Sequence, residues 1–546
     1  MKVLVTEAIS DNGLEILRQA APVDVRLGLK GDELVAAIKD YSVLVVRSAT
    51  RVTAEVIEAA DRLRIIGRCG VGVDNIDVPA ATRRGVLVLN SPYGNTQAAA
   101  EHTISLMFAL ARNIPDAVAA MRAGQWERNQ FVGTELHDKV LGVIGFGKIG
   151  SEVTRRAQGL GMDVVVFDPL LNRERARNMN VEVVELEELF GRADFISFHV
   201  PLNRHTHHLL NAERIELLKP TARIINCARG GVIDEAALAE ALHRGRVAGA
   251  ALDVWEHEPP FGEHRSPLLD APHVIPTPHL GASTAEAQEN VAVDVARQVL
   301  EAWRGEPVQG AVNLPALEAE EHRRLKPYLT LAEELGVFLA QLSAGGRLDR
   351  VEISYLGRLH DAPTAPLTRA VLRGLLRTFH GDDTINYINV PSVVEERGIQ
   401  VSESRSMESS TYHSVLRVRV SGEGVEHVAD GSCFGADPRF VALDGYPFNI
   451  VPEGHLLVWW NTDQPGVIGK VGTLLGDAGV NIAGMQLGRD AIGGRAVSIV
   501  EIDSGLEQPL IDAILAIPGM LDVRTVDFSN GQTSGVRLAL PVSAGD

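Results

Sequence analysis

The chain has 546 residues, 45% of them hydrophobic and 23% charged, and its formal net charge is −19. These shares are those of an ordinary globular protein, and a prior of about 150 residues per domain predicts three or four domains. The negative charge argues against nucleic acid or an anionic membrane as a partner, so an anionic ligand would need a local cluster of arginines.

The three cysteines, Cys69, Cys227 and Cys433, are scattered and form no C-x-x-C pair. We expect them to be small buried hydrophobes, with neither a disulfide framework nor a metal site. No run of about 18 apolar residues occurs, and the first ten residues do not read as a signal peptide. A soluble, cytoplasmic protein is therefore expected.

The first 90 residues alternate short apolar strands with helical patterns. The expected strands are Val3–Thr6, Val23–Leu27, Val43–Arg47, Ile65–Arg68 and Val86–Asn90. This alternation predicts a parallel α/β domain, and such sheets bind ligands at the carboxyl ends of their strands. Arg47, Arg68 and Asn90 lie at those ends.

A long and almost uniformly apolar stretch follows at Ala98–Ile114. It is too short and too interrupted to cross a membrane, so it predicts a buried helix that connects two domains. The next segment, Gly124–Leu136, contains Trp126 and Arg128.

The stretch Lys139–Gly150, KVLGVIGFGKIG, is the centre of the second predicted domain. An apolar strand, Val140–Ile144, leads into Gly145, Gly147 and Gly150 with the spacing G-x-G-x-x-G, and a helix follows. The first glycine permits a tight turn, the second lets a pyrophosphate approach the backbone, and the third lets helix and strand pack closely. The helix N-terminus offers free N–H groups to the phosphates.

A second strand, Val164–Phe167, ends in Asp168. A carboxylate there can accept hydrogen bonds from a ribose 2′-hydroxyl and would repel a 2′-phosphate, which favours NAD over NADP. Strand, glycine-rich turn, helix and acid in this order predict a dinucleotide site, whereas the glycines alone would be a weak signal.

Further strands are expected at Ile196–Val200, Ile224–Ala228, Gly249–Val254 and Val274–Pro276. Arg229, Glu258 and His279 follow the last three of them. A histidine can take the proton of an alcohol, a carboxylate can orient the imidazole, and an arginine can clamp a carboxylate with two hydrogen bonds.

Taken singly, each of these residues has an ordinary interpretation. His279 could be a surface histidine, Glu258 could lie in a solvated turn, and Arg229 could cap a helix. As an ordered set behind a dinucleotide fingerprint, they favour oxidation of a 2-hydroxy acid.

The C-terminal part begins with a helical stretch at Thr284–Trp303 that is expected to return the chain to the first domain. The composition changes near Pro315, and the middle region shows helices at Leu325–Leu342 and Leu367–Phe379 but no chemical motif. From His455 the pattern is βαββαβ, and the tail has the composition of a flexible linker.

Several long stretches resemble D-isomer-specific 2-hydroxy-acid dehydrogenases. They are GRCGVGVDNIDVPAATRRGVLVLNSPYGNTQAAAEHT, VIGFGKIG, NCARGGVIDE, ALDVWEHEPP and TPHLGAST. Within this family the chain is similar to the long subfamily that acts on 3-phosphoglycerate, in which an intervening domain and an ACT domain follow the catalytic part. The implied activity is NAD-dependent oxidation of 3-phosphoglycerate to 3-phosphohydroxypyruvate, the first step of L-serine biosynthesis.

The resemblance also implies roles for individual residues. His279 would be the acid/base, Glu258 its partner and Arg229 the carboxylate clamp, with the backbone of Val71 and Gly72 also at the substrate carboxylate. The implied NAD site comprises Gly145, Gly147, Lys148, Ile149, Gly150, Asp168, Val200, Cys227, Ala228, Arg229, Asp253, His279, Leu280, Gly281 and Ala282.

The phosphate of such a substrate needs further cations. Arg47 and Arg68 are the candidates in the first domain, although each could be an ordinary surface arginine. Arg128 matches a basic segment that can reach the site of a neighbouring subunit.

The segment 461–489 resembles the ACT fold, a sensor of small ligands that usually pairs across subunits. The implied effector is L-serine, whose ammonium Asp463 could bind and to which Asn481 could offer its amide. A purely structural dimerisation module is the alternative.

The expected fold is therefore α/β, with a Rossmann NAD-binding domain, a discontinuous flavodoxin-like substrate domain, an α+β intervening domain and a βαββαβ ACT domain. The expected ranges are 1–97 with 285–314 for the substrate domain, 98–284 for the NAD domain, 315–453 for the intervening domain, 454–529 for the ACT domain and 530–546 for the tail. A homodimer or homotetramer is expected.

Two alternatives to this function remain at this stage. One is a glyoxylate or hydroxypyruvate reductase with the same catalytic residues, which usually lacks the sensor domain. The other is a non-enzymatic, NAD-sensing interaction protein, against which the presence of all three catalytic residues argues.

Overall fold

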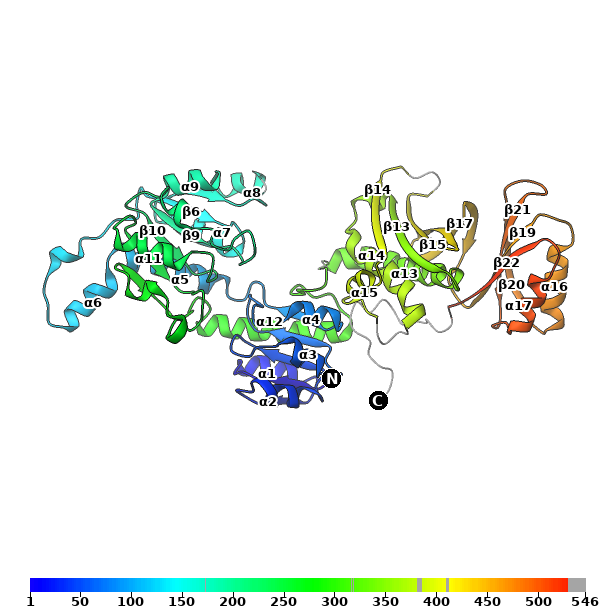
Figure 1. Ribbon diagram of the computed structural model, residues 1–546, viewed down its shortest axis with the longest axis horizontal. Helices are drawn as coiled ribbons and strands as arrows, with labels where there is room; N and C mark the ends of the chain where they lie inside the picture. The colour runs from blue at the N-terminus through cyan, green and yellow to red at the C-terminus, as the bar shows by residue number, and fades with distance from the viewer. Residues whose placement is uncertain (172, 316, 318, 381–384, 409–411, 529–546) are drawn as a thin grey trace.

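The computed structural model describes residues 1–171, 173–315, 317, 319–380, 385–408 and 412–528. The molecule is elongated (Figure 1), with two α/β domains towards one end and the intervening and ACT domains towards the other. The expected fold class is confirmed. The predicted tail 530–546 lies outside the described residues.

The substrate domain contains a five-stranded parallel sheet of order β2-β1-β3-β4-β5, which is the flavodoxin order. Its strands are β1 (Val3–Val5), β2 (Val23–Val25), β3 (Val43–Val46), β4 (Ile65–Arg68) and β5 (Leu87–Asn90). Its helices are α1 (Asp11–Arg18), α2 (Gly31–Ile38), α3 (Ala54–Glu58) and α4 (Val78–Arg83).

Helix α12 (Ala285–Arg304) returns to this sheet after the second domain, so the substrate domain is discontinuous in sequence. Its apolar face, including Ala292 and Val295, joins the core formed by β1, β3 and α1. The contact is close, because a Cβ on Gly13 of α1 would lie 2.9 Å from the Cβ of Ala292.

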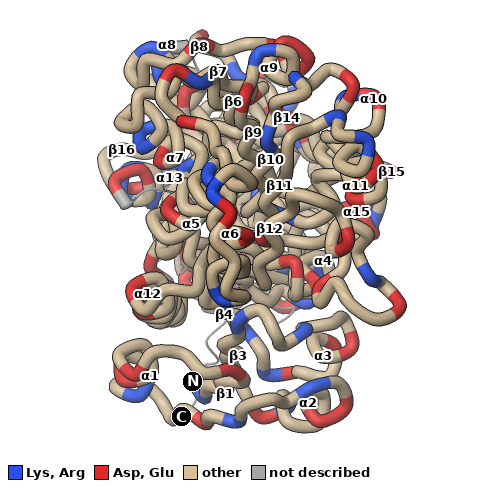
Figure 2. The backbone as a smooth tube through the Cα atoms, turned by 90° about the vertical axis from the view of Figure 1, so that its left-hand side faces the viewer, with Lys and Arg blue, Asp and Glu red and all other residues tan. Residues whose placement is uncertain are grey.

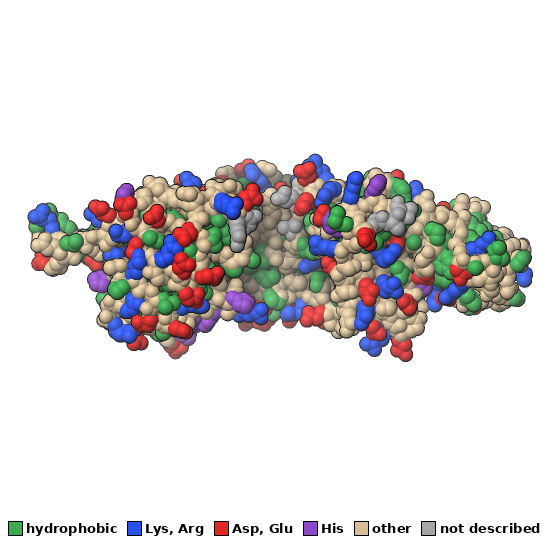
Figure 3. All heavy atoms as spheres, turned by 90° about the horizontal axis from the view of Figure 1, so that it is seen from above, with side chains coloured by type: hydrophobic (Ala, Val, Ile, Leu, Met, Phe, Trp, Pro, Cys, Tyr) green, Lys and Arg blue, Asp and Glu red, His purple; other side chains and the backbone are tan. Residues whose placement is uncertain are grey.

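The connector predicted as one helix is two helices with a sharp bend. Helix α5 (Thr96–Ala111) ends before Asn113, whose φ of 52° is left-handed, and α6 (Ile114–Arg122) begins with Pro115 in its first turn. Figure 3 shows the α6 arm projecting from the end of the molecule, with hydrophobic side chains exposed on it. Among the described residues no single helix is long and apolar enough to cross a membrane, and α5 with α6 meets that test only as a pair bent by 62°.

The NAD domain has a seven-stranded parallel sheet of order β12-β11-β10-β9-β6-β7-β8, which is a Rossmann order extended by one strand. Its strands are β6 (Val140–Ile144), β7 (Asp163–Phe167), β8 (Glu182–Val183), β9 (Phe195–Phe198), β10 (Arg223–Asn226), β11 (Gly249–Leu252) and β12 (Val274–Pro276). Around it lie α7 (Lys148–Gly159), α8 (Arg173–Asn178), α9 (Leu186–Arg192), α10 (Ala212–Ile215), α11 (Glu235–His243) and the short 3₁₀ turns η1 (Arg128–Phe131), η2 (Gly262–His264) and η3 (Pro267–Asp270).

The intervening domain pairs two long helices with a six-stranded sheet of order β14-β13-β15-β16-β17-β18. The helices are α13 (Ala319–Leu342), α14 (Thr364–His380) and α15 (Val390–Glu396), with the turn η4 (Arg358–Asp361). The strands are β13 (Arg347–Gly357), β14 (Gln400–Ser406), β15 (Ser414–Glu423), β16 (Val425–Phe434), β17 (Asp437–Leu443) and β18 (Tyr446–Ile450).

The ACT domain has the expected βαββαβ order and a four-stranded antiparallel sheet of order β20-β21-β19-β22. Its elements are β19 (His455–Thr462), α16 (Val467–Asp477), β20 (Ile482–Arg489), β21 (Arg495–Ile502), α17 (Gln508–Leu515) and β22 (Met520–Asp527). Both helices pack on one face of the sheet, where Leu475 of α16 and Ile514 of α17 share a core with Trp459 of β19.

The intervening domain is anchored to the substrate domain. Ile388, which is 3% exposed, belongs to the core of the substrate domain rather than to that of its own sheet. Beside it, Asn386 donates from Nδ2 to the carbonyl oxygen of Gly85 over 2.9 Å. The C-terminal part of the chain is therefore attached to the substrate domain through a buried contact.

Candidate functional site

A cleft of about 1060 Å³ runs between the substrate domain and the NAD domain, the two α/β units that lie one above the other in Figure 2. The residues around it come from the carboxyl ends of strands in both sheets. It brings together six of the predicted site residues, namely Arg47, Arg68, Arg229, Glu258, His279 and Ala282.

His279 and Glu258 form a hydrogen-bonded pair in this cleft. Nδ1 of His279 lies 2.8 Å from Oε2 of Glu258. The other carboxylate oxygen, Oε1, accepts from the backbone N–H of Trp255 over 3.2 Å, which fixes the carboxylate. The backbone of His279 is left-handed, with φ of 56°, where the chain turns after β12.

The pairing defines the protonation of the imidazole. The hydrogen bond to Glu258 raises the pKa of His279, against the opposing effect of burial. Because Nδ1 faces a carboxylate acceptor, the neutral ring carries its hydrogen on Nδ1 and leaves Nε2 to take a proton.

Arg229 follows β10 and reaches across the cleft. Its Nε lies 3.1 Å from Oδ2 of Asp74, a residue of the substrate domain. Its Nη1 donates to the carbonyl oxygen of Ala228 over 2.6 Å. The side-chain amide of Asn226 donates to the carbonyl oxygen of Arg229 over 2.9 Å, which holds the turn after the strand.

The substrate-domain wall of the cleft is rich in cations. Lys30, Arg47, Arg51 and Arg68 line it. Burial lowers the pKa of Arg68, and the nearby charge of Arg229 lowers it further. Within the described ranges, the buried Nε of Arg68 has no hydrogen-bond partner.

The glycine-rich turn has the geometry that a pyrophosphate site needs. Gly145 has φ of 91°, and a Cβ on Gly150 would collide with the carbonyl oxygen of Gly145. At Gly147, the residue before α7, a Cβ would meet no atom within 4 Å, so the space above the helix N-terminus is open. Because Gly147 has no side chain with which to cap the helix, the first N–H groups of α7 can receive phosphate oxygens.

Asp168 at the end of β7 is held by two backbone donors. Its Oδ2 accepts from the N–H of Phe146 over 2.7 Å and its Oδ1 accepts from the N–H of Leu170 over 2.8 Å. Each carboxylate oxygen keeps further acceptor capacity. Asp168 therefore lies beside the glycine turn, and its contact with the ribose stays a prediction.

Asp253 organises the loop that carries the other predicted NAD residues. It accepts from the N–H groups of Leu280 and Gly281, each over 2.8 Å, and from the hydroxyl of Thr277 over 2.6 Å. Burial opposes its ionisation, but these donors and His102 outweigh that effect and hold its pKa below the usual range.

The remaining predicted NAD residues lie near the same edge. The side chain of Val200 packs beside Gly145, Lys148 and Ile149 are in the first turn of α7, and Ala282 lines the cleft. Burial raises the pKa of Cys227 to about 12, so this thiol is suited to lining a site rather than to acting as a nucleophile.

Three predicted substrate residues are not among those that line the cleft. The carbonyl oxygen of Val71 accepts from Nδ2 of Asn90 over 2.5 Å. Gly72 lies against the guanidinium of Arg229, where a Cβ would collide with Nη2. Arg128 lies in η1 near the projecting arm, outside the cleft of its own chain.

Both predicted effector residues already have partners inside the ACT domain. Asp463 pairs with Arg489, with Oδ2 and Nη1 2.9 Å apart. Asn481 donates from Nδ2 to Oδ2 of Asp503 over 2.9 Å. Any ligand that uses these groups has to share or replace those contacts.

Sequence reasoning missed several members of the cleft. Lys30 and Arg51 follow strands of the first sheet, so the rule that identified Arg47 could have found them. Asp74 gave no signal, because its partner Arg229 lies 155 residues away in sequence.

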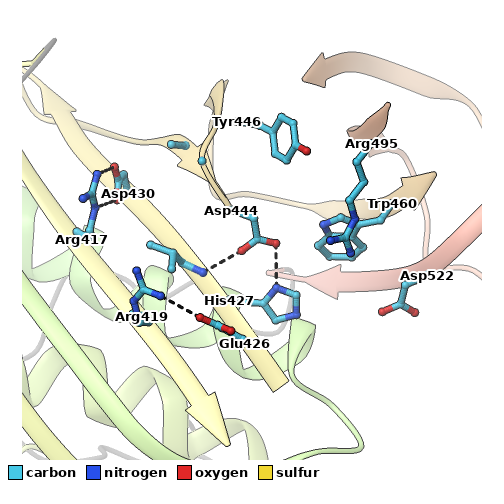
Figure 4. A pocket seen from close by; sticks show the side chains of 13 residues that line it. Arg417, Arg419, Glu426, His427, Asp430, Asp444, Tyr446, Trp460, Arg495 and Asp522 are labelled. Carbon is cyan, nitrogen blue, oxygen red and sulfur yellow. Dashed lines mark hydrogen bonds and ion pairs between the residues drawn. The ribbon is translucent and has the colours of Figure 1, made fainter. Parts of the chain in front are cut away.

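A second cavity, of about 560 Å³, lies between the intervening and ACT domains (Figure 4). Its charged side chains are largely paired with each other: Arg417 with Asp430, Arg419 with Glu426, and His427 with Asp444. His427 also packs against Trp460 of the ACT domain, with ring centroids 5.3 Å apart.

Within the described ranges, no group of three or more His, Cys, Asp or Glu side chains is arranged to hold a metal ion.

Comparison with protein families gives three matches in chain order. Residues 104–281 match the NAD-binding domain of D-isomer-specific 2-hydroxyacid dehydrogenases. Residues 324–444 match the D-3-phosphoglycerate dehydrogenase intervening domain, and residues 455–519 match the ACT domain. The second domain is thus an NAD-binding domain.

Full-length relatives are similar to this chain from end to end. The D-3-phosphoglycerate dehydrogenase of Synechocystis is 46% identical over 527 residues, covering 96% of this chain and 94% of the relative. The protein of the same name from Methanocaldococcus jannaschii is 43% identical and covers 97% of this chain and 100% of the relative.

Among solved structures, a D-lactate dehydrogenase from Aquifex aeolicus, complexed with NAD and lactic acid, is similar with a TM-score of 0.52. It is 28% identical, and the match covers 56% of this chain and 96% of that one. The apo-structure of D-lactate dehydrogenase from Escherichia coli is similar with a TM-score of 0.51 and 28% identity, covering 57% of this chain and 100% of that one. From the three matched domains and the end-to-end relatives, the chain belongs to the D-3-phosphoglycerate dehydrogenase family.

Proposed function

We propose that this protein is an NAD-dependent D-3-phosphoglycerate dehydrogenase. It oxidises the C2 hydroxyl of 3-phosphoglycerate to give 3-phosphohydroxypyruvate, the entry reaction of L-serine biosynthesis. The observation that carries the proposal is one cleft in which the His279–Glu258 pair and Arg229 face a wall that contains Lys30, Arg47, Arg51 and Arg68.

The two ends of the substrate are bound by different domains. Arg229, together with the backbone N–H groups of Val71 and Gly72, receives the carboxylate, because a guanidinium can bind both carboxylate oxygens. Arg47 and Arg68 receive the phosphate. The buried Nε of Arg68 has no hydrogen-bond partner in the part of the chain that the structure describes. This supports the assignment, since a buried donor gains stability from an anionic acceptor.

His279 removes the proton from the C2 hydroxyl at Nε2, while Glu258 stabilises the imidazolium that forms. Arg229 polarises the carboxylate next to the reacting carbon. When bound, NAD accepts the hydride that leaves C2. Closure of the cleft excludes water, which strengthens these charged contacts.

The residues that would hold NAD are those of the glycine turn and its neighbours. The open space at Gly147 and the N-terminus of α7 suit the pyrophosphate, and Asp168 suits the ribose. Lys148 and Ile149 cover the pyrophosphate side. Val200, Cys227, Ala228, Asp253, Leu280, Gly281 and Ala282 complete the site.

The direct test is NADH formation by the purified protein with 3-phosphoglycerate or D-glycerate, compared with NADH consumption with glyoxylate or hydroxypyruvate. The proposal requires a large preference for the phosphorylated acid. A preference for glyoxylate or unphosphorylated hydroxypyruvate would instead make the protein a reductase, and no turnover with any of them would contradict an enzymatic role.

We propose the domain division stated from the sequence: 1–97 with 285–314 for substrate, 98–284 for NAD, 315–453 as the intervening domain, 454–529 as the ACT domain and 530–546 as a tail.

L-serine is proposed as the effector of the ACT domain, near Asp463, Asn481 and the N-terminus of α16. Inhibition by L-serine but not D-serine would support this assignment.

We also propose a cytoplasmic homodimer or homotetramer. The arm carries exposed apolar side chains, including Ile114, Val118, Met121 and Trp126, the last of which is 74% exposed. Contiguous apolar surface of this kind suits a subunit contact, and Arg128 nearby could then reach the partner's cleft. Light scattering coupled to gel filtration measures the assembly state, and a monomer at micromolar concentration would contradict it.

A further inference from the structure

The guanidinium of Arg229 is already engaged by an acid of the facing domain. Its Nε lies 3.1 Å from Oδ2 of Asp74, and its Nη1 donates to the carbonyl oxygen of Ala228 over 2.6 Å. A guanidinium clamps a carboxylate through two parallel N–H groups, either Nε with Nη2 or Nη1 with Nη2. Each of these two edges of Arg229 therefore has one nitrogen in use.

The two acceptors differ in how they can be removed. Ala228 is the residue next to Arg229, so its carbonyl oxygen moves together with the arginine. Asp74 belongs to the other domain, and its side chain is 70% exposed. A substrate carboxylate can therefore replace Asp74 more readily than it can replace the carbonyl of Ala228.

Asp74 also occupies the place that the substrate carboxylate is expected to take. Asp74 and Arg229 both lie against Gly72. A Cβ on Gly72 would lie 2.7 Å from Oδ2 of Asp74 and would collide with Nη2 of Arg229. Gly72 and Arg229 are the groups proposed to receive the substrate carboxylate. An oxygen of Asp74 thus lies where a carboxylate oxygen of the substrate would lie.

The loop that carries Asp74 is held firmly. The next residue, Asn75, donates from Nδ2 to the carbonyl oxygens of Arg47 and Thr50, over 2.8 and 2.6 Å. The position of Asp74 is therefore tied to the loop of Arg47, the residue proposed to bind the phosphate.

We propose that Asp74 is a built-in competitor for the substrate carboxylate, which occupies Arg229 in the ligand-free protein and is displaced when a 2-hydroxy acid binds. This inference rests on the proposed function. Asp74 acts as a positioning residue: it keeps Arg229 directed into the cleft without substrate and makes binding of weak carboxylates less favourable. Because Asp74 is displaced before chemistry, it affects substrate binding and not the proton transfer at His279.

The test compares Asp74→Asn with Asp77→Asn in the full-length protein. Asp77 lines the same cleft, and it caps α4 by accepting from the N–H of Ala80 over 2.9 Å, a function that asparagine keeps. Both variants remove one negative charge from the cleft, so a general electrostatic effect would be equal in the two. Of these two aspartates, it is Asp74 whose carboxylate pairs with Arg229.

The readouts are the dissociation constant of oxalate, measured by calorimetry with NADH present, and KM and kcat for 3-phosphoglycerate. Partly exposed ion pairs contribute about 0.2–1 kcal/mol, so we expect Asp74→Asn to bind oxalate roughly 1.4- to fivefold more tightly than the wild type. The KM should fall by a similar factor while kcat stays within about twofold, and Asp77→Asn should change neither. Asp74→Ala, which has no side-chain oxygen, should behave as Asp74→Asn does.

Equal effects in Asp74→Asn and Asp77→Asn would overturn the inference, as would weaker oxalate binding or a raised KM in Asp74→Asn. The outcomes also separate this inference from the proposed function. If the wild type binds oxalate but does not oxidise 3-phosphoglycerate, the function is wrong, and tighter oxalate binding by Asp74→Asn would still establish the competition.

Discussion

Replacing Glu258 by glutamine is expected to slow the reaction and to move its pH dependence to lower pH. The carboxylate lies 2.8 Å from Nδ1 of His279, and this hydrogen bond raises the pKa of the imidazole. An amide in its place keeps the shape but removes the charge that stabilises the imidazolium. The pKa of His279 is then lower in the variant than in the wild type.

The magnitude follows from the exposure of the pair. Hydrogen bonds to charged groups contribute about 1.5–3 kcal/mol. The side chains of His279 and Glu258 are 48% and 40% exposed, so solvent screening places this pair at the lower end of that range. Since 1.36 kcal/mol corresponds to a tenfold change in rate, we expect kcat/KM to fall by roughly tenfold.

The assay is kcat/KM against pH in both directions. Oxidation needs unprotonated His279, so activity rises as pH increases through the pKa of this residue, and the rise begins at lower pH in Glu258→Gln. Reduction of the keto acid needs protonated His279, so its activity is lost at lower pH in the variant. The matched control is Glu256→Gln, which lines the same cleft but pairs with His208.

If kcat/KM and its pH dependence are the same in Glu258→Gln as in the wild type, the role of the pair is refuted. If kcat/KM falls tenfold but its pH dependence does not move, Glu258 only orients the imidazole ring. If the pH dependence of Glu256→Gln moves as far as that of Glu258→Gln, the effect comes from the overall charge of the cleft.

Four further predictions follow from the same geometry. His279→Ala should lose about 10²- to 10⁴-fold in kcat while NADH binding measured by fluorescence is retained, and near-normal turnover would remove His279 from the mechanism. Arg47→Ala should reduce kcat/KM much more for 3-phosphoglycerate than for D-glycerate, and equal losses would refute its contact with phosphate. Gly147→Ala should weaken NADH binding at an unchanged Tm, because a Cβ at this position meets no protein atom. Gly150→Ala should lower Tm, because a Cβ there collides with the carbonyl oxygen of Gly145, and the reverse pattern would contradict the assignment of the turn. Ile388→Ala should lower the free energy of unfolding, measured with urea, by about 2–5 kcal/mol. The reason is that this side chain is 3% exposed in the core of the substrate domain. A loss below about 0.5 kcal/mol would show that Ile388 is not part of that core.

The strands of the two catalytic sheets were predictable because they are short apolar runs between helices. Val140–Ile144 agrees between sequence and structure residue for residue, and Ile65–Arg68 does as well. Parallel strands buried on both faces give the strongest local signal. The βαββαβ order expected from His455 onward is also the order that the structure shows.

The connector and the intervening sheet were harder. The apolar run at Ala98–Ile114 continues through the bend at Asn113, so hydrophobicity alone did not separate α5 from α6. Pro115, which favours the first turn of a helix, was the available signal. Strand β14 is polar and largely exposed at the edge of its sheet, so it has no alternating apolar pattern to detect.

The places of Arg229, Glu258 and His279 after strands, and the pairing of Glu258 with His279, were predictable, but the contact of Arg229 was not. Arg229 was expected to face a ligand, and the structure pairs it with Asp74 across two domains. The docking of Ile388 into the substrate domain is likewise a contact between residues far apart in sequence. Such pairings depend on how whole domains pack together, which local patterns do not encode.

The most direct test of the central claim uses 3-phosphoglycerate deuterated at C2. If the cleft oxidises the C2 hydroxyl as proposed, the deuterium is transferred to the cofactor, the NADH formed is one mass unit heavier, and the product is 3-phosphohydroxypyruvate. Unlabelled NADH, or no NADH from this substrate under conditions where the protein binds NAD, would contradict the account.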